Sequence, residues 1–304
     1  MNFEGIYTPL ITPYRADGDI DYDALVALVE NLVQAGVDGV VSGGSTGEYY
    51  AQSIDERVKL AELTKAVVGN RAKVIVGTGA IQLRDSIAMA EAAAKICVDA
   101  ILVGSPPYAV PTEKENAANA LAIDRAANLP IMLYNYPGRM CVTMGEEFLD
   151  RVCRSRNFQG IKESSGDINR LHLLAREYAH IQLCCGMDDQ ALEYFAWGAK
   201  GWVCGGSNFL AKEHLALYRA CVQKGDFQKG RRIMSALLPL MRVLEQGGKF
   251  IQCIKYGVDL SGGYGGLPRA PLSGLTTEEK RTLEQVVGVL KRTICEVEKD
   301  AGNE

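Results

Sequence analysis

The chain has 304 residues, of which 47% are hydrophobic and 23% are charged, and this composition is ordinary for a globular protein. Its net charge of −4 and the lack of any basic run argue against a nucleic-acid partner. No apolar stretch approaches the roughly 18 residues of a membrane span, and the N-terminus lacks the features of a secretion signal, so we expect a cytoplasmic protein.

Short apolar runs alternate along the chain with longer amphipathic segments. We expect strands at 5–12, 39–44, 73–79, 99–107, 130–137, 160–164, 181–186 and 201–206. Eight strand-then-helix units spaced roughly 20–35 residues apart are what an eightfold α/β barrel requires. The competing doubly wound sheet usually carries a glycine-rich turn after its first strand, whereas this chain has "TPYRADGD" there.

The first expected helix shows the pattern clearly. Its apolar residues recur at helical spacing, and these are Leu25, Leu28, Val29 and Leu32. Asp19 or Asp21 can cap its start, and Gly36 can end it. After the eighth strand the chain continues through further helix-like stretches with no linker. We therefore predict an α/β fold, with a (β/α)8 TIM barrel at 1–225 and a C-terminal helical extension packed on it at 226–304.

The metal-ligating residue types show no pattern typical of a metal site. None of the nine cysteines forms a CxxC, and the three histidines have no HxxxH or HxH spacing. We expect reduced thiols, no metal and no cofactor.

Polar residues follow several of the expected strands. Because functional side chains of such barrels lie at the C-terminal ends of the strands, these residues are expected to converge on one face. The most informative of them are Ser45, Thr46, Tyr108, Tyr134, Arg139, Lys162 and Asp188.

A lysine at the end of a buried strand is the most unusual of these residues. Burial of an amine favours its neutral, nucleophilic form, which can attack a ketone and form an imine. The protonated imine withdraws electrons, so proton loss from the adjacent carbon gives an enamine, the carbon nucleophile of an aldol reaction. Lys162 would be that amine, and Tyr134 would transfer the protons. Arg139 would bind a substrate carboxylate through the two parallel N–H groups of its guanidinium.

Each of these residues also has a structural alternative. Lys162 could pair with Glu163 at the barrel rim, and Tyr134 could be a core tyrosine with a satisfied hydroxyl. The hydroxyls of the "GGSTGE" turn could cap the next segment, and Asp189 could cap the helix that follows it. It is the joint placement at successive strand ends that favours catalysis.

The same residues carry a resemblance. Over essentially its whole length the chain resembles the dihydrodipicolinate synthase/N-acetylneuraminate lyase family of Schiff-base pyruvate aldolases. The matching motifs are Gly43–Glu48, Gly77–Gly79, Tyr134–Pro137, Ile161–Glu163 and Arg269–Leu272. The resemblance implies a barrel with a C-terminal helical extension, assembled as a homotetramer that is a dimer of dimers.

The resemblance also implies roles for individual residues. Lys162 would form the imine with pyruvate or another 2-oxo acid, and Tyr134 would transfer the proton. Ser45 and Thr46 would bind the pyruvate carboxylate, with Ser45 also in the proton relay. Tyr108 matches a tyrosine that the synthases borrow from the neighbouring subunit.

The substrate-binding residues implied in this way mix features of the two branches of the family. They are Thr46, Arg139, Ser164, Asp188, Gly44 and Val203. Arg139 matches the synthase arginine that binds the second substrate's carboxylate, whereas Ser164 places a hydroxyl where the lyases have one. Gly205 stands where the lyases use a sugar-binding serine.

The resemblance further implies that the lysine feedback site of many synthases is absent. At the positions of its polar residues stand Ile54, Arg57, Ile81 and Pro107. We therefore expect no inhibition by lysine, and a catabolic aldolase becomes a rival to a biosynthetic synthase.

We thus expect a lyase resembling 4-hydroxy-tetrahydrodipicolinate synthase, which condenses an enamine with a carboxylate-bearing aldehyde. The alternatives are a 2-keto-3-deoxy sugar acid or N-acetylneuraminate-type aldolase, and a dehydratase or deaminase that uses the same imine. A phosphate-handling barrel is another, since "GGSN" after the last strand could form an anion nest. A non-catalytic barrel is disfavoured by the costly amine at Lys162.

Overall fold

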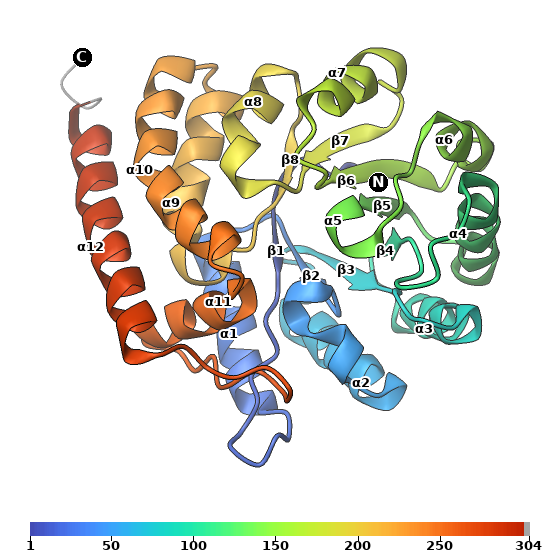
Figure 1. Cartoon of the computed structure of the whole chain (residues 1–304), viewed down its shortest axis with the longest axis horizontal. Coiled ribbons are helices and arrows are strands. Elements are labelled where there is room, and N and C mark those ends of the chain that lie inside the picture. Colours follow the sequence, from blue (N-terminus) through green and yellow to red (C-terminus); the bar gives the residue numbers. More distant parts are fainter. Residues whose placement is uncertain (301–304) are drawn as a thin grey trace.

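The computed structural model describes residues 1–300 as a closed barrel of parallel strands, β1 to β8, in which each strand pairs with its neighbours in chain order (Figure 1). The strands are β1 Gly5–Pro9, β2 Gly39–Ser42, β3 Lys73–Gly77, β4 Ala100–Gly104, β5 Ile131–Asn135, β6 Phe158–Glu163, β7 Gln182–Cys185 and β8 Gly201–Val203. Pairing of β1 with β8 closes the ring. The predicted TIM barrel is confirmed.

Helices follow the strands and surround them. They are α1 Tyr22–Ala35, α2 Ile54–Val68, α3 Leu83–Ile96, α4 Glu113–Ala127, α5 Pro137–Met140, α6 Glu146–Val152, α7 Ile168–Glu177, α8 Ala191–Ala196, α9 Ser207–Tyr218, α10 Phe227–Gln246, α11 Phe250–Leu260 and α12 Thr277–Asp300. Short 3-10 turns lie at η1 Ser45–Gly47, η2 Tyr49–Ala51 and η3 Asp188–Gln190, and a π-helical turn, η4, spans Arg219–Gln223.

Helix α1 begins and ends where its sequence indicates. The Asp21 carboxylate accepts the Ala24 N–H at 3.0 Å, so Asp21, and not Asp19, is the cap. Gly36 ends the helix in the left-handed region with φ 87°, a conformation that glycine adopts without strain. Seven of the eight strands are shorter than predicted, whereas β6 begins two residues before the predicted start and ends one residue before the predicted end. The fourth one stops at Gly104, before two prolines that have no N–H for the strand ladder.

The apolar residues form two layers of core. One layer fills the barrel interior, with Phe3, Tyr7, Val41, Ile75, Ala100, Leu102, Met132, Tyr134, Cys184 and Val203. The larger layer lies between the strands and the surrounding helices. This division follows from the alternation of side chains along each strand, which sends successive residues to opposite faces of the sheet.

Helices α10, α11 and α12 form the C-terminal extension and gather on one side of the barrel, drawn in orange and red in Figure 1. Helix α10 packs against α12, α11, α9 and α8, and it also contacts η3 after β7. The extension is therefore fixed against the end of the barrel where β7 and β8 terminate. The proposed division at residue 225 stays a prediction, and residues 301–304 lie outside the described part.

Two properties bear on the compartment of the protein. In residues 1–300, none of the helices is long and apolar enough to cross a membrane. All nine cysteines are free thiols.

Candidate active site

A cavity opens at the C-terminal ends of the strands. It is lined by Pro9, Ser45, Thr46, Tyr134, Tyr136, Arg139, Lys162, Gly186, Met187, Asp188, Val203, Gly205, Glu245 and Phe250. Most of these residues belong to strand ends and the loops after them, but the last two come from the C-terminal extension. The structure thus brings together seven of the ten site residues predicted from the sequence: Lys162, Tyr134, Ser45, Thr46, Arg139, Asp188 and Val203.

Lys162 lies near the end of β6, next to Tyr134 on β5 in the strand register. Its side chain is 7% exposed, and its Nζ lies 4.2 Å from the centroid of the Tyr134 ring. Glu163, the next residue, points to the opposite face of the sheet, where its carboxylate pairs with the Arg170 guanidinium at 2.7 Å. The alternative pairing of Lys162 with Glu163 is therefore wrong.

A glycine directly after the neighbouring strand, β7, makes room for the lysine. A Cβ at Gly186 would lie 2.8 Å from Lys162 Cγ and would also collide with Ser164 Oγ. Ser164 is 2% exposed, and its hydroxyl donates a hydrogen bond to the Gly186 carbonyl at 2.9 Å. The Ser164 hydroxyl is thus engaged by the protein, and Ser164 does not line the cavity. This position does not support its predicted role in substrate binding.

The hydroxyls of the "GGSTGE" turn come close to the tyrosine. Ser45 Oγ lies 3.4 Å from Tyr134 Oη, at the outer limit of a hydrogen bond. Thr46, the next residue of turn η1, is 5% exposed and lines the same cavity. Gly44 precedes the turn in an extended conformation and is buried beneath it. A phenol and two hydroxyls therefore surround the space in front of the amine.

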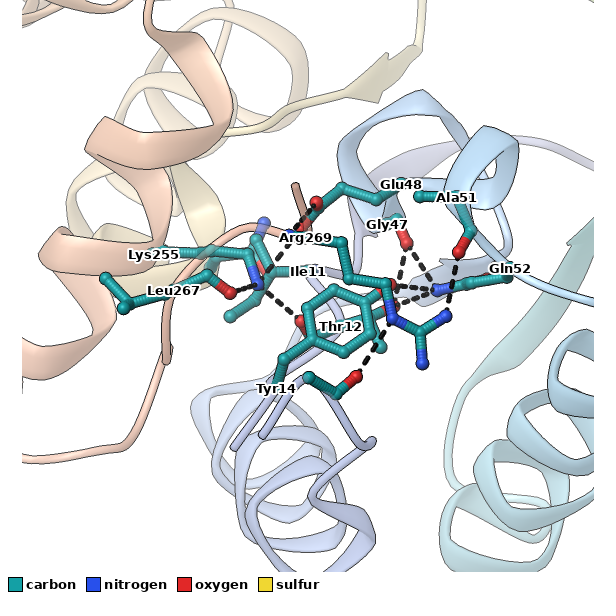
Figure 2. Close-up of polar contacts among 12 residues, drawn as sticks. Ile11, Thr12, Tyr14, Gly47, Glu48, Ala51, Gln52, Lys255, Leu267 and Arg269 are labelled. Carbon is teal, nitrogen blue, oxygen red and sulfur yellow. Dashed lines mark hydrogen bonds and ion pairs between the residues drawn. The ribbon is translucent and has the colours of Figure 1, made fainter. Parts of the chain in front are cut away.

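The C-terminal extension holds this turn in place (Figure 2). Glu48 follows η1 with φ 60°, a left-handed conformation that is unusual for a residue other than glycine. Its fully buried carboxylate forms an ion pair with Lys255 Nζ on α11 at 3.0 Å and accepts the Arg269 N–H at 3.0 Å. Gln52 Nε2 donates to the Gly47 carbonyl at 2.8 Å. These contacts fix the backbone that carries Ser45 and Thr46.

Arg139 lies on the short helix α5 at the mouth of the cavity, where it is exposed. Its guanidinium lies 5.3 Å from the centroid of the Tyr136 ring, a cation–π contact that restrains its orientation. An exposed, planar guanidinium beside a cavity can bind a carboxylate through two parallel hydrogen bonds. The position of Arg139 is compatible with the predicted carboxylate binding.

Asp188 lies in the cavity wall with both carboxylate oxygens already engaged. Trp202 Nε1 donates to one oxygen at 2.9 Å, and the Gly205 N–H donates to the other at 3.1 Å. Burial raises the pKa of Asp188 to about 6, although the Trp202 hydrogen bond opposes that shift. Its neighbour Asp189 does not cap α8, which has no side-chain cap, so that alternative is wrong.

Glu245 and Phe250 are cavity residues that sequence reasoning missed. Glu245 belongs to the last turn of α10, and burial together with the nearby Asp188 and Asp189 charges raises the pKa of its carboxyl to about 7. Phe250 begins α11 and packs against Gly205. A carboxylate at the end of an amphipathic helix is ordinarily exposed. Glu245 lines the cavity because α10 packs against η3.

Tyr108 lies outside the cavity of its own chain. It is 92% exposed with φ 69°, beyond the end of β4. It lines a second, larger hollow together with Tyr50, Ile81 and Arg139, and the two hollows lie next to each other because they share Ser45 and Arg139. The positions of the lysine feedback site also fall in this hollow. There the buried Arg57 donates to the Gly77 carbonyl at 2.8 Å.

Among residues 1–300, no group of three or more His, Cys, Asp and Glu side chains is arranged to hold a metal ion. The side chains that line the cavity supply an amine, two phenols, two hydroxyls, one guanidinium and two carboxyl groups.

Comparison with known proteins identifies relatives across the whole chain. The sequence profile of the Dihydrodipicolinate synthetase family matches residues 2–290. The 4-hydroxy-tetrahydrodipicolinate synthase of Exiguobacterium sp. strain AT1b is 35% identical over 274 residues, which cover 89% of this chain and 92% of that relative. The solved structure of the synthase from Methylacidiphilum fumariolicum SolV has a TM-score of 0.93 and 30% identity, and the match covers 98% of this chain and 99% of the other.

A sialic acid aldolase of Ruminococcus gnavus shares the fold, with a TM-score of 0.90, 24% identity and coverage of 98% of this chain and 97% of its own. The resemblance inferred from the motifs, and with it the expected class of enzyme, a lyase, is confirmed.

Proposed function

We propose that this chain, which belongs to the Dihydrodipicolinate synthetase family, forms a Schiff base between Lys162 and pyruvate or a related 2-oxo acid and joins the resulting enamine to a carboxylate-bearing aldehyde. The observation that carries the proposal is the buried Lys162 amine. It faces a cavity, and within residues 1–300 it makes no hydrogen bond or ion pair that would occupy it. Such an amine is available as a nucleophile.

The chemistry proceeds in balanced steps. Lys162 Nζ adds to the ketone carbon of the 2-oxo acid, and loss of the ketone oxygen as water gives a protonated imine. The imine draws electrons from the neighbouring carbon, which loses a proton and becomes the nucleophilic end of an enamine. That carbon attacks the aldehyde carbon, the aldehyde oxygen takes up a proton, and water finally releases the product from Lys162.

In this proposal Tyr134 and Ser45 carry the protons. Their oxygens are 3.4 Å apart, and the Tyr134 ring lies against Lys162 Nζ. A phenol can donate and accept within such a chain. Thr46 and Ser45 offer hydroxyl donors to the carboxylate of the 2-oxo acid, in a turn that the Glu48–Lys255 ion pair keeps rigid.

The identity of the second substrate rests on Arg139 and Gly205. Arg139 supports an aldehyde that carries a carboxylate. A side chain at position 205 would collide with the tip of the Phe250 ring, so the serine with which the lyases bind sugar would require that ring to move. Together with relatives that are named synthases, this favours the synthase-like reaction over an N-acetylneuraminate-type one.

Assembly of the chain as a homotetramer, a dimer of dimers, is part of the proposal. Three large side chains, at least half exposed, line the hollow next to the cavity: Tyr50, Ile81 and Tyr108. A second subunit would cover these apolar groups and bring its own Tyr108 toward the cavity. Mixing inactive Lys162→Ala and Tyr108→Phe chains should then restore part of the activity, whereas no restoration would exclude a shared site.

Two further expectations belong to the proposal. The free cysteines support a reducing, cytoplasmic compartment. Inhibition by lysine is not expected, because the positive Arg57 and the apolar Ile54 and Ile81 line the hollow where a cationic amino acid would have to bind.

The test is a product assay. The protein is incubated with pyruvate and a panel of aldehydes with and without carboxylates, and new carbon–carbon bonds are detected by mass spectrometry. We expect products from carboxylate-bearing aldehydes, none with Lys162→Ala, and a selective loss of those aldehydes with Arg139→Ala. Loss of water or ammonia from a 2-oxo acid without any condensation would instead identify a dehydratase or deaminase.

A further inference from the structure

The cavity contains two carboxyl groups with different surroundings. Asp188 is 4% exposed, and each of its oxygens accepts a hydrogen bond from the protein. Glu245 lines the same cavity, but within residues 1–300 its carboxyl makes no hydrogen bond or ion pair. A half-buried carboxylate without a donor is costly, because it has given up water and received nothing in return. Of the two acids, Glu245 is the one with free hydrogen-bonding capacity.

The position of Glu245 is set by the packing of the extension. It lies in the last turn of α10, and α10 contacts η3, the turn that carries Asp188 and Asp189. The other charged groups close enough to act on it are Arg139 and Lys162. Glu245 therefore lines the same cavity as the imine-forming amine and the guanidinium that would hold the second substrate.

The extension also decides which groups can line this side of the cavity. Position 205, in the loop after β8, is a glycine without a side chain, and Phe250 packs against it. Glu245, in the same part of the extension, supplies the polar group in its place. The acceptor half of the site is thus lined by one guanidinium from α5 and one unpaired carboxyl from α10.

We propose, building on the function proposed above, that Glu245 is a specificity-determining residue that accepts a hydrogen bond from a donor group, a hydroxyl or an ammonium, on the aldehyde whose carboxylate Arg139 binds. Burial raises the pKa of Glu245 to about 7, so at pH 8 most of it is ionised. An ionised carboxylate is only an acceptor, so it selects for substrates with a donor and against those without one. A substrate with a carboxylate at one position and a donor at another then satisfies both side chains and has only one productive orientation.

The experiment compares matched aldehydes that differ only in the donor. 2-Hydroxy-4-oxobutanoate is paired with succinate semialdehyde for the hydroxyl, and L-aspartate 4-semialdehyde is paired with succinate semialdehyde for the ammonium. All assays are run at pH 8. For each pair the ratio of kcat/KM values is measured with pyruvate as the partner. The ratio within a pair cancels any general loss of activity in a variant. The variants are Glu245→Gln, Glu245→Leu and, as a control on the same helix, the exposed Gln246→Leu.

We expect the wild type to prefer the donor-bearing member of at least one pair, and Glu245→Leu to lose that preference by about tenfold or more, as for loss of a charge-assisted hydrogen bond. The control variant Gln246→Leu should keep the wild-type preference for the donor-bearing aldehyde. The behaviour of Glu245→Gln distinguishes the donors. An amide oxygen still accepts from a hydroxyl, so most of that preference survives, but the preference for an ammonium falls with the charge.

The outcomes also separate this inference from the proposed function. If wild-type protein treated with pyruvate and borohydride forms no adduct on Lys162, both fail together. If the adduct forms and condensation proceeds, but Glu245→Leu keeps the wild-type ratios or the wild type has no preference in either pair, the assignment of Glu245 alone is wrong.

Discussion

Two buried lysines, Lys162 and Lys255, both lie over a tyrosine ring but differ in the hydrogen-bond acceptors around their amines. Each Nζ lies over a tyrosine ring, at 4.2 Å from the Tyr134 centroid for Lys162 and 4.4 Å from the Tyr14 centroid for Lys255. Lys255 also pairs with Glu48 at 3.0 Å, and it donates to the carbonyls of Thr12 and Leu267 at 2.6 and 3.0 Å (Figure 2). Lys162 has none of these acceptors.

The difference shows that burial of an amine does not by itself identify a nucleophile. Burial lowers the pKa of Lys255, and the Glu48 carboxylate opposes that shift, so the ammonium is held inside a network of acceptors. All of its donors are used, and the result is a structural link between α11 and turn η1. Lys162 faces a cavity instead, with its lone pair open to a substrate.

The largest expected effect is on catalysis. Lys162→Ala should lower turnover by about 10⁴-fold or more, because it removes the nucleophile. The melting temperature should stay close to that of the wild type. Within residues 1–300 Lys162 has no hydrogen-bond or ion-pair partner, so its removal leaves no buried polar group unpaired. Assay of kcat and a thermal melt on the same sample give both values. Substantial residual turnover would mean that the imine forms elsewhere.

The corresponding change at the other lysine should act on stability. Lys255→Met leaves the Glu48 carboxylate buried without its cation and should lower the free energy of unfolding by about 3–5 kcal/mol. Adding Glu48→Gln should recover part of the loss. Urea unfolding of the single and double variants measures both effects. Full stability of Lys255→Met would contradict the structural role assigned to the network.

Most of the fold, and the part of the site that lies on strands, follow from local sequence. Apolar runs predict the strands, and the rule that function lies at strand ends brings Ser45, Tyr134 and Lys162 together. Glu245 and Lys255 could not be found in this way. Both lie on helices of the extension, where a charged residue ordinarily faces water, and their surroundings arise only when the extension packs on loops far away in sequence.

The availability of a hydroxyl at a strand end was also beyond local sequence. Ser164 follows Lys162 by two residues and lies on the same side, since a Cβ at Gly186 would meet both side chains. Its hydroxyl is nevertheless bound to the Gly186 carbonyl, a partner that follows β7, and Ser164 does not line the cavity.

The tyrosines beside the two lysines, Tyr134 and Tyr14, form a second matched pair. Tyr134→Phe should lower kcat by about 10²-fold or more while the imine still forms, because proton transfer loses its phenol. Tyr14 is the matched control. Its hydroxyl accepts from Gln52 at 2.8 Å, so Tyr14→Phe should cost about 1 kcal/mol of stability and leave kcat nearly unchanged. Equal kcat values for the two variants would remove Tyr134 from the proton relay.

The smallest expected effect is a dependence of stability on pH. The pKa of Glu245 is raised by burial from its ordinary value near 4.5 to about 7. Between those values the folded chain keeps a proton that the unfolded chain has lost, so this residue's contribution to stability declines as the pH rises. The melting temperature of Glu245→Gln relative to wild type should therefore increase between pH 5 and pH 8, by about 2 °C for a chain of this size. A difference that stays constant with pH would show that the carboxyl titrates normally.

The assignment of Lys162 as the nucleophile is tested most directly by finding which lysine reacts with a 2-oxo acid. The protein is incubated with pyruvate, reduced with borohydride and digested, and the modified peptides are identified by mass spectrometry. We expect a single reduced pyruvyl adduct on Lys162 and none on Lys255. An adduct on Lys255 or on another lysine, or no adduct with any 2-oxo acid, would contradict the assignment of Lys162 as the nucleophile.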